Sequence, residues 1–143
     1  MVDLTSLYRT AEQEHIEIIP YPLPQTGSMA LETEDGQYFI GIDFDSLRDP
    51  RDRLVHLGHE LGHCICGAFY NRYAKMDLRQ RHENKADKWA IHKLIPESAL
   101  DEAVAMGCTQ LWELAEHFHV PEDFIRKAVC LYTHGNLATE LYF

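Results

Sequence analysis

The stretch His59-Glu60-Leu61-Gly62-His63 constrains this chain more than any other part of its sequence. Residues that are four apart lie one turn above each other on one face of an α-helix. In a helix, His59 and His63 could therefore bind one metal ion from the same side, with Glu60 beside it. Two imidazole ligands and a carboxylate general base are the arrangement of a zinc hydrolase. The alternative is a surface helix that carries two solvated histidines.

Apolar residues surround this stretch at helical spacing, which favours the metal site over a solvated surface. One face of the expected helix carries Leu54, Leu57, Gly58, Leu61, Ile65 and Phe69. The histidines and the glutamate lie on the neighbouring face, close to the core, where polar groups need partners. Gly58 and Gly62 remove side-chain bulk, although a glycine in a helix costs about 1 kcal/mol relative to alanine. We therefore expect another element to approach the helix closely at these glycines.

A catalytic zinc site has a third protein ligand and an open position for water, and Glu83 is the best candidate for that ligand. It lies on a second expected helix, from about Leu78 to Leu94, which follows an N-cap at Asp77. Pro96 ends this helix. The alternatives are His56, one turn before the motif, as the third ligand, or an ordinary charged helix face around Glu83.

Asp87 lies one turn beyond Glu83 on the same expected face. A carboxylate there can accept the outer N–H of a ligating histidine, which fixes the tautomer of the imidazole and raises its basicity. In the linker before this helix, Tyr70 and Tyr73 are candidates to stabilise an oxyanion by donating a hydrogen bond. The alternative for both tyrosines is a packing role.

Two separated segments, HLGHELGHC at 56–64 and ENKADKWAIHKLIP at 83–96, resemble the ImmA/IrrE family of bacterial and phage metallopeptidases. The matching residues of the second segment are Glu83, Ala86, Asp87, Trp89, Ala90, Leu94 and Pro96. The ligand set also resembles that of the thermolysin-like gluzincins, in which an aspartate follows the glutamate ligand by one turn. The resemblance covers most of the chain and is weakest over the N-terminal residues and the last ten.

The resemblance implies an α+β fold, a minimal zincin-like (gluzincin-like) metallopeptidase with a small antiparallel sheet and two metal-binding helices. It implies that His59, His63 and Glu83 bind Zn2+, with Mn2+ or Fe2+ as alternatives in the cell. Asp87 would orient a histidine, and Glu60 would be the catalytic base of an endopeptidase. Members of this family act on helix-turn-helix repressors, so we expect such a repressor, from a phage or mobile element, as the substrate.

Two other functions stay open. A non-catalytic anti-repressor would bind the repressor and use the metal only structurally, and a DNA-binding regulator would use the C-terminal helices. The presence of Glu60 favours the enzyme, because a structural site gains nothing from a general base. Structural zinc sites also usually have four protein ligands, whereas we find three good candidates.

The chain of 143 residues is long enough for one domain with a modest core. We expect a metallopeptidase core at residues 1–96, on which a C-terminal helical unit at residues 97–143 packs. The core would begin with a short helix over residues 4–11 and a strand over residues 16–19.

A β-hairpin is expected next, with arms at residues 30–33 and 37–43 around the turn Glu34-Asp35-Gly36. By resemblance to zincins, the arm at 37–43 would bind a substrate backbone by strand addition. A purely structural hairpin is the alternative.

Three short helices are expected after Pro96, at residues 97–106, 110–118 and 121–132. Thr109 is the expected cap of the second, and the last two resemble a helix-turn-helix. A DNA reader carries basic or amide side chains early in its second helix, whereas this one begins with Glu122 and Asp123. We therefore expect a unit whose aromatic residues pack on the core or hold the repressor, namely Trp112, Phe118 and Phe124.

The net charge of −10 has the wrong sign for nucleic-acid binding and suits a basic protein partner, with simple solubility as the alternative. The sequence shows no apolar run of membrane-spanning length and no signal peptide, so we expect a cytoplasmic location and reduced cysteines. The resemblance implies a bacterial cytoplasm and is compatible with a phage gene. Cys64 and Cys66 are expected to be small buried hydrophobes rather than ligands.

Overall fold

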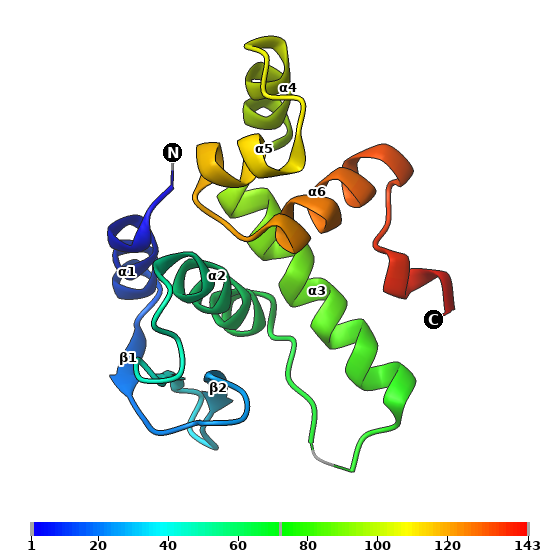
Figure 1. Cartoon of the computed structure of the whole chain (residues 1–143). Coiled ribbons are helices and arrows are strands. Elements are labelled where there is room, and N and C mark those ends of the chain that lie inside the picture. The colour runs from blue at the N-terminus through cyan, green and yellow to red at the C-terminus, as the bar shows by residue number, and fades with distance from the viewer. Residues whose placement is uncertain (1, 72, 143) are drawn as a thin grey trace.

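The computed structural model describes residues 2–71 and 73–142. Its elements in chain order are α1 (Leu4–Gln13), β1 (Ile16–Pro20), β2 (Ser28–Glu32), β3 (Tyr38–Ile42), α2 (Pro50–Cys66), α3 (Met76–Leu94), α4 (Glu97–Ala105), α5 (Leu111–Phe118), α6 (Glu122–His134) and the 3-10 helix η1 (Ala138–Tyr142). The strands gather at one end of the molecule and the later helices at the other, so the fold is α+β, as predicted (Figure 1). Over the described residues, no helix is both long enough and apolar enough to cross a membrane.

The sheet has three strands in the order β1-β3-β2. β1 pairs with β3 in parallel and β2 pairs with it antiparallel, so Ile40 lies between Ile18 and Ala30. The prediction of an antiparallel sheet is therefore wrong in one respect, because the sheet is mixed. The chain reverses its direction twice between β1 and β3, in the loop 21–27 and in the turn 33–37, and two reversals restore the first direction.

β2 is the edge strand of this sheet on the side of α2, which it contacts. The prediction that the arm at residues 37–43 accepts a substrate strand is wrong, because β3 is already paired on both sides. Strand addition needs a sheet edge with unpaired backbone groups. Beside α2, only β2 offers such an edge among the described strands.

The helix α2 carries the histidine motif and has clear signals at both ends. Asp49 caps it by accepting a hydrogen bond from the backbone N–H of Arg51 at 2.9 Å, and Pro50 occupies the first turn. Gly67 ends the helix in the left-handed conformation, at a φ of 62°. The helix buries one apolar face, made of Leu54, Leu57 and Leu61.

The helix α3 packs on α2 at two glycines, as predicted. A Cβ added to Gly62 would lie 2.6 Å from the backbone oxygen of Ala86, and one added to Gly58 would lie 3.2 Å from Cδ1 of Leu94. Only glycine fits at position 62 unless the backbone of α3 moves. This close packing brings the polar faces of the two helices together.

Two of the predicted helix caps are wrong. Lys75, whose backbone is extended, is the N-cap of α3, so Asp77 lies inside the first turn instead. A carboxylate in the first turn still stabilises the positive end of the helix dipole. Gln110 rather than Thr109 precedes α5, and its backbone N–H donates to Glu113 Oε1 at 3.2 Å.

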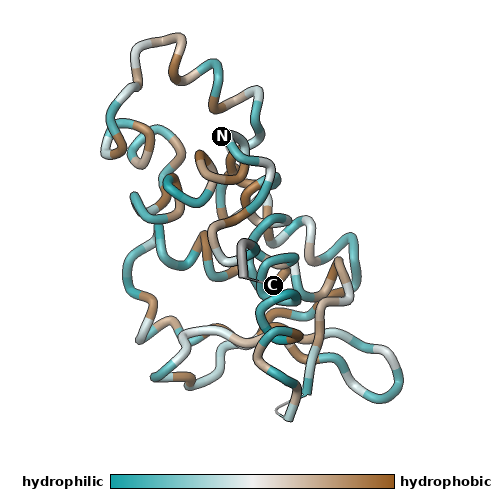
Figure 2. The backbone as a smooth tube through the Cα atoms, turned by 90° about the vertical axis from the view of Figure 1, so that its right-hand side faces the viewer, coloured by the Kyte–Doolittle hydropathy of each residue, from teal (hydrophilic) through white to brown (hydrophobic). Residues whose placement is uncertain are grey.

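One continuous hydrophobic core joins α1, the sheet and α2 to the C-terminal helices. Hydrophobic and hydrophilic segments alternate along the helices in Figure 2, as expected when each helix has one face on this core. Phe118 and Phe124 are buried, as predicted, but Trp112 is 56% exposed. Leu114, Ala115 and Phe118 form the buried side of α5, so Trp112 does not pack on the core, and its alternative role of holding the repressor stays a prediction.

The four cysteines of the chain are free thiols. Cys64 is buried, as predicted, whereas Cys66 is exposed, because residues two apart point to different sides of a helix. Burial raises the pKa of the Cys64 thiol to about 12, so this thiol stays protonated near neutral pH.

Candidate metal centre

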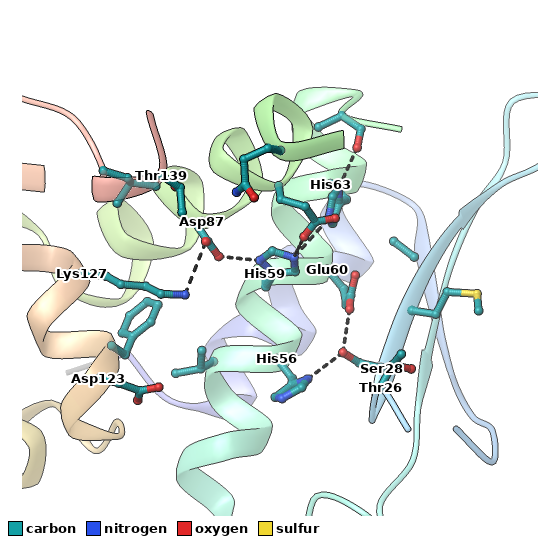
Figure 3. Close-up of a pocket in the computed structure, with 18 of the residues that line it drawn as sticks. Thr26, Ser28, His56, His59, Glu60, His63, Asp87, Asp123, Lys127 and Thr139 are labelled. Carbon is teal, nitrogen blue, oxygen red and sulfur yellow. Dashed lines mark hydrogen bonds and ion pairs between the residues drawn. The ribbon is translucent and has the colours of Figure 1, made fainter. Parts of the chain in front are cut away.

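The contact between α2 and α3 brings the three predicted ligands to one point. Nε2 of His59 lies 3.1 Å from Nε2 of His63. The Glu83 carboxylate reaches across from α3, with Oε2 2.7 Å from Nε2 of His59 and Oε1 3.1 Å from Nε2 of His63. Two imidazole nitrogens and a carboxylate oxygen thus converge from two helices, as Figure 3 shows for the two imidazoles.

The outer nitrogen of each imidazole has a partner of its own. Nδ1 of His59 lies 2.7 Å from Oδ1 of Asp87, and Nδ1 of His63 lies 2.6 Å from the backbone oxygen of Ala68. A carbonyl oxygen can only accept, so Nδ1 of His63 carries a hydrogen, and Nε2 of the neutral ring presents a lone pair. The Asp87 carboxylate orders His59 in the same way.

Two lone pairs that face each other at 3.1 Å repel unless a proton or a cation lies between them. The Glu83 carboxylate beside them adds negative charge to the same point. Two neutral imidazoles, a carboxylate and fixed outer hydrogen bonds are the donor set of a divalent transition-metal site. The side chains present therefore fit a metal ion.

The pKa shifts of these side chains also show that a positive charge is stabilised at this point. Burial disfavours the charged form of His59, but the hydrogen bonds to Asp87 and Glu83 outweigh it and raise the pKa of His59 to about 10. Burial likewise opposes ionisation of Glu83, yet the bonds to His59 and His63 hold its pKa well below the usual range. A cation bound at this point would be stabilised in the same way.

Glu60 lies beside this cluster and is buried. One of its carboxylate oxygens lies within 4.8 Å of the ligand nitrogens of His59 and His63, so both Glu60 and Glu83 approach the same point. Glu83 contacts the two Nε2 atoms directly, whereas Oε2 of Glu60 accepts a hydrogen bond from Ser28 Oγ at 2.6 Å. Glu83 is therefore the better placed ligand, and Glu60 is held to one side of it.

His56 lies away from the cluster. Its Nδ1 is 2.9 Å from Ser28 Oγ, and Figure 3 shows its ring directed toward β2 rather than toward the other two imidazoles. The structure thus separates His56 from the point where the ligands converge. Ser28 itself was not predicted, because nothing in the sequence marks a serine 32 residues from Glu60 as its partner.

The two candidate tyrosines differ in position. The Tyr70 hydroxyl donates to Glu83 Oε1 at 2.8 Å, and burial together with the Glu83 charge raises the pKa of Tyr70 to about 12. Tyr73, by contrast, is 78% exposed and is not among the residues that line the cavity. Only Tyr70 is therefore brought to the site.

The cluster lines an open cleft with a volume of about 1500 Å³. Met29 and Leu31 of β2 line one wall, and Phe124 and Lys127 of α6 line another. Lys127 Nζ also lies 3.5 Å from Oδ2 of Asp87, an ion pair that joins α6 to the carboxylate behind His59 (Figure 3). The second helix of the helix-turn-helix-like unit therefore faces the cleft.

A small mixed sheet, a helix with two histidines four residues apart and a second helix with a glutamate beside them make a minimal zincin-like fold. The family model of the IrrE N-terminal-like domain (Peptidase_M78) matches residues 11–129. The chain belongs to this metallopeptidase family, which confirms the resemblance seen in the sequence. No curated protein and no solved structure matches the chain.

Proposed function

We propose that this protein is a zinc-dependent endopeptidase that cleaves a helix-turn-helix repressor of a phage or mobile element. The proposal is carried by one observation, the convergence of His59, His63 and Glu83 on one point with Glu60 beside it. Two imidazoles and a carboxylate suit Zn2+, and Mn2+ or Fe2+ are alternatives because availability in the cell also selects the metal.

When bound by His59, His63 and Glu83, the ion would polarise a peptide carbonyl and make a water molecule more acidic. Glu60 takes the proton of that attacking water and later gives it to the leaving amine. Asp87 and the Ala68 carbonyl keep the two histidines in the tautomer that leaves Nε2 free.

Tyr70 lines the cleft and is the remaining candidate for donating to the oxyanion that forms, once its hydroxyl leaves Glu83. We do not propose this role for Tyr73, which is exposed.

The edge strand β2 supports an extended substrate. It is paired on one side only, and its residues Met29 and Leu31, which are 49% and 53% exposed, line the cleft. A peptide that pairs with β2 gains backbone hydrogen bonds, and its side chains contact these apolar residues. Because β2 begins at Ser28, next to Glu60, such a peptide would pass the metal cluster.

The net charge of the chain and the position of α6 support a DNA-binding protein as substrate. The chain carries a net charge of −10, and proteins that bind nucleic acid are basic on their binding face. α6 forms a wall of the cleft, so the C-terminal unit would touch the bound protein instead of DNA. We place this encounter in the bacterial cytoplasm, where a DNA-bound repressor acts.

The test is to mix the purified, zinc-loaded chain with a helix-turn-helix repressor, chosen first from any that is encoded beside its gene. The parent chain should produce discrete repressor fragments, and a Glu60→Gln chain with the same zinc content should produce none. Relief of repression to the same extent by both chains in cells, with the repressor intact, would instead identify a non-catalytic anti-repressor.

A further inference from the structure

Ser28 lies between Glu60 and His56, and it is 6% exposed. Its Oγ is 2.6 Å from Oε2 of Glu60 and 2.9 Å from Nδ1 of His56. Figure 3 shows Ser28 of β2 between the Glu60 and His56 side chains of α2, with the second carboxylate oxygen of Glu60 on the side of the histidine cluster. Ser28 and Glu60 are buried and His56 is half-buried, and the chemistry of the three groups fixes the direction of each hydrogen bond.

The directions follow from the chemistry of the three groups. A serine hydroxyl has one hydrogen, and an ionised carboxylate can only accept, so Ser28 donates to Glu60. The Ser28 oxygen must then accept from His56, which requires the tautomer with hydrogen on Nδ1. Burial lowers the pKa of His56 against the opposing charges of Glu60 and Asp52, so this ring is neutral near pH 7 and has a definite tautomer.

The backbone holds Ser28 firmly in this place. Ser28 is the first residue of β2 and pairs with Ile42 of β3. The preceding Gly27 has a φ of +79°, donates to the Leu23 oxygen at 2.7 Å and accepts from the Asp43 N–H at 2.8 Å. The hydroxyl therefore comes from a fixed strand end, whereas the Glu60 side chain has several rotatable bonds.

We propose that Ser28 is a positioning residue, which holds Oε2 of Glu60 so that the other carboxylate oxygen faces the reacting water, and that His56 orients the Ser28 hydroxyl. This role rests on the proposed peptidase function. Ser28 begins the strand on which we place the substrate. The same strand end therefore fixes the position of the peptide and the orientation of the general base. In this proposal His56 acts on Glu60 through Ser28 and does not bind the metal.

The experiment uses the full chain, loaded with zinc, as parent, Ser28→Ala and Ser28→Thr. Ser46→Ala is the matched control, because Ser46 Oγ donates to Asp43 Oδ2 at 2.8 Å and lies outside the cleft lining. A quenched fluorescent peptide library of mixed sequence supplies the peptide that the parent cleaves fastest. The measurements are zinc content, kcat and KM for that peptide, and the tautomer of His56 from long-range 15N–1H correlations.

We expect His56 of the parent to carry its hydrogen on Nδ1. Ser28→Ala should keep its zinc and its KM but lose roughly tenfold or more in kcat, as for one hydrogen bond to a charged group. Ser28→Thr should recover most of that loss, and Ser46→Ala should cleave like the parent. A split between kcat and KM with rescue by threonine is not expected from a serine that only stabilises the fold.

Two results would overturn the proposal: an unchanged kcat in zinc-loaded Ser28→Ala, or a parent in which His56 carries its hydrogen on Nε2. The second result needs no variant, so it decides the matter even if Ser28→Ala does not fold. If the zinc-loaded parent cleaves no peptide, the proposed function fails, and the His56 tautomer alone then decides whether Ser28 holds Glu60 as described.

Discussion

Gly62 of α2 faces Ala86 of α3 so closely that a Cβ on Gly62 would lie 2.6 Å from the Ala86 backbone oxygen. Gly62→Ala must therefore push the two helices apart. We expect its free energy of unfolding to fall by roughly 1–3 kcal/mol, the usual cost of overpacking, and its zinc affinity to fall as His63 and Glu83 separate.

Gly58→Ala is the matched control for this prediction. A Cβ at Gly58 would meet side-chain atoms and no backbone, with Cδ1 of Leu94 at 3.2 Å and Cβ of Ala90 at 3.5 Å, and alanine favours a helix over glycine by about 1 kcal/mol. We expect Gly58→Ala to be as stable as the parent or more so. Urea unfolding of the three chains makes the comparison, and equal midpoints for Gly62→Ala and the parent would contradict a tight helix contact.

Glu83 should be the third metal ligand. We expect the parent to bind one zinc ion per chain and Glu83→Ala to bind it more weakly by roughly 100-fold or more, because a ligand is lost rather than an outer partner. His56→Ala should bind zinc like the parent, since His56 contacts Ser28 instead. Elemental analysis and titration against a chelator measure both. If zinc binding survives Glu83→Ala and is lost in His56→Ala, then His56 and not Glu83 is the third ligand.

Glu140, near the C-terminal end of the chain, should make the free energy of unfolding depend on pH. Burial raises the pKa of Glu140, but the Lys88 ammonium and the Leu137 N–H, at 2.6 Å, outweigh it and lower the pKa below 4.5. A lowered folded-state pKa contributes stability above the unfolded-state value, and this contribution disappears as the pH falls through the folded-state value.

Glu140→Gln should accordingly be less stable than the parent near neutral pH, by about 1 kcal/mol or less because the pair is partly exposed. The difference should shrink as the pH falls below 4.5 and through the lowered pKa of Glu140. Urea midpoints of both chains across this range make the measurement, and a difference that grows toward acid pH would show that the sign is wrong.

The C-terminal helices should not bind duplex DNA. α6 begins with Glu122 and Asp123, and its Arg126 and Lys127 line the cleft, with Lys127 paired to Asp87. Non-specific DNA binding needs several phosphate contacts from basic side chains. Fluorescence anisotropy with labelled duplex at physiological salt should show no binding. Salt-sensitive binding that the double substitution of Arg126→Ala and Lys127→Ala abolishes would support a DNA-binding regulator.

Local sequence patterns predicted the parts of this molecule that lie within one or two helices. Gly58 and Gly62 predicted the close approach of α3. The spacing of the two histidines on one helix, and of Glu83 and Asp87 on the other, predicted which side chains α2 and α3 bring together. Each of these relations depends on the period of a helix, which can be read from the chain directly.

Relations that depend on the order of strands could not be predicted in this way. The hairpin was expected, but only the structure shows that β1 pairs with β3 and leaves β2 at the edge beside α2. The partnership of Ser28 with Glu60 follows from that order. Cys66 was assigned to the interior because it is apolar, whereas the side of the helix on which it lies decides its exposure.

The rate at which zinc-loaded parent and Glu60→Gln chains cleave the same peptide bond tests the proposed catalysis most directly. Glutamine keeps the size of the side chain and can still accept the Ser28 hydrogen bond, but it cannot take a proton from water. We predict equal zinc content in the two chains and cleavage slower by roughly 100-fold or more in Glu60→Gln. A Glu60→Gln chain that cleaves as fast as the parent would contradict the role of Glu60 as the general base.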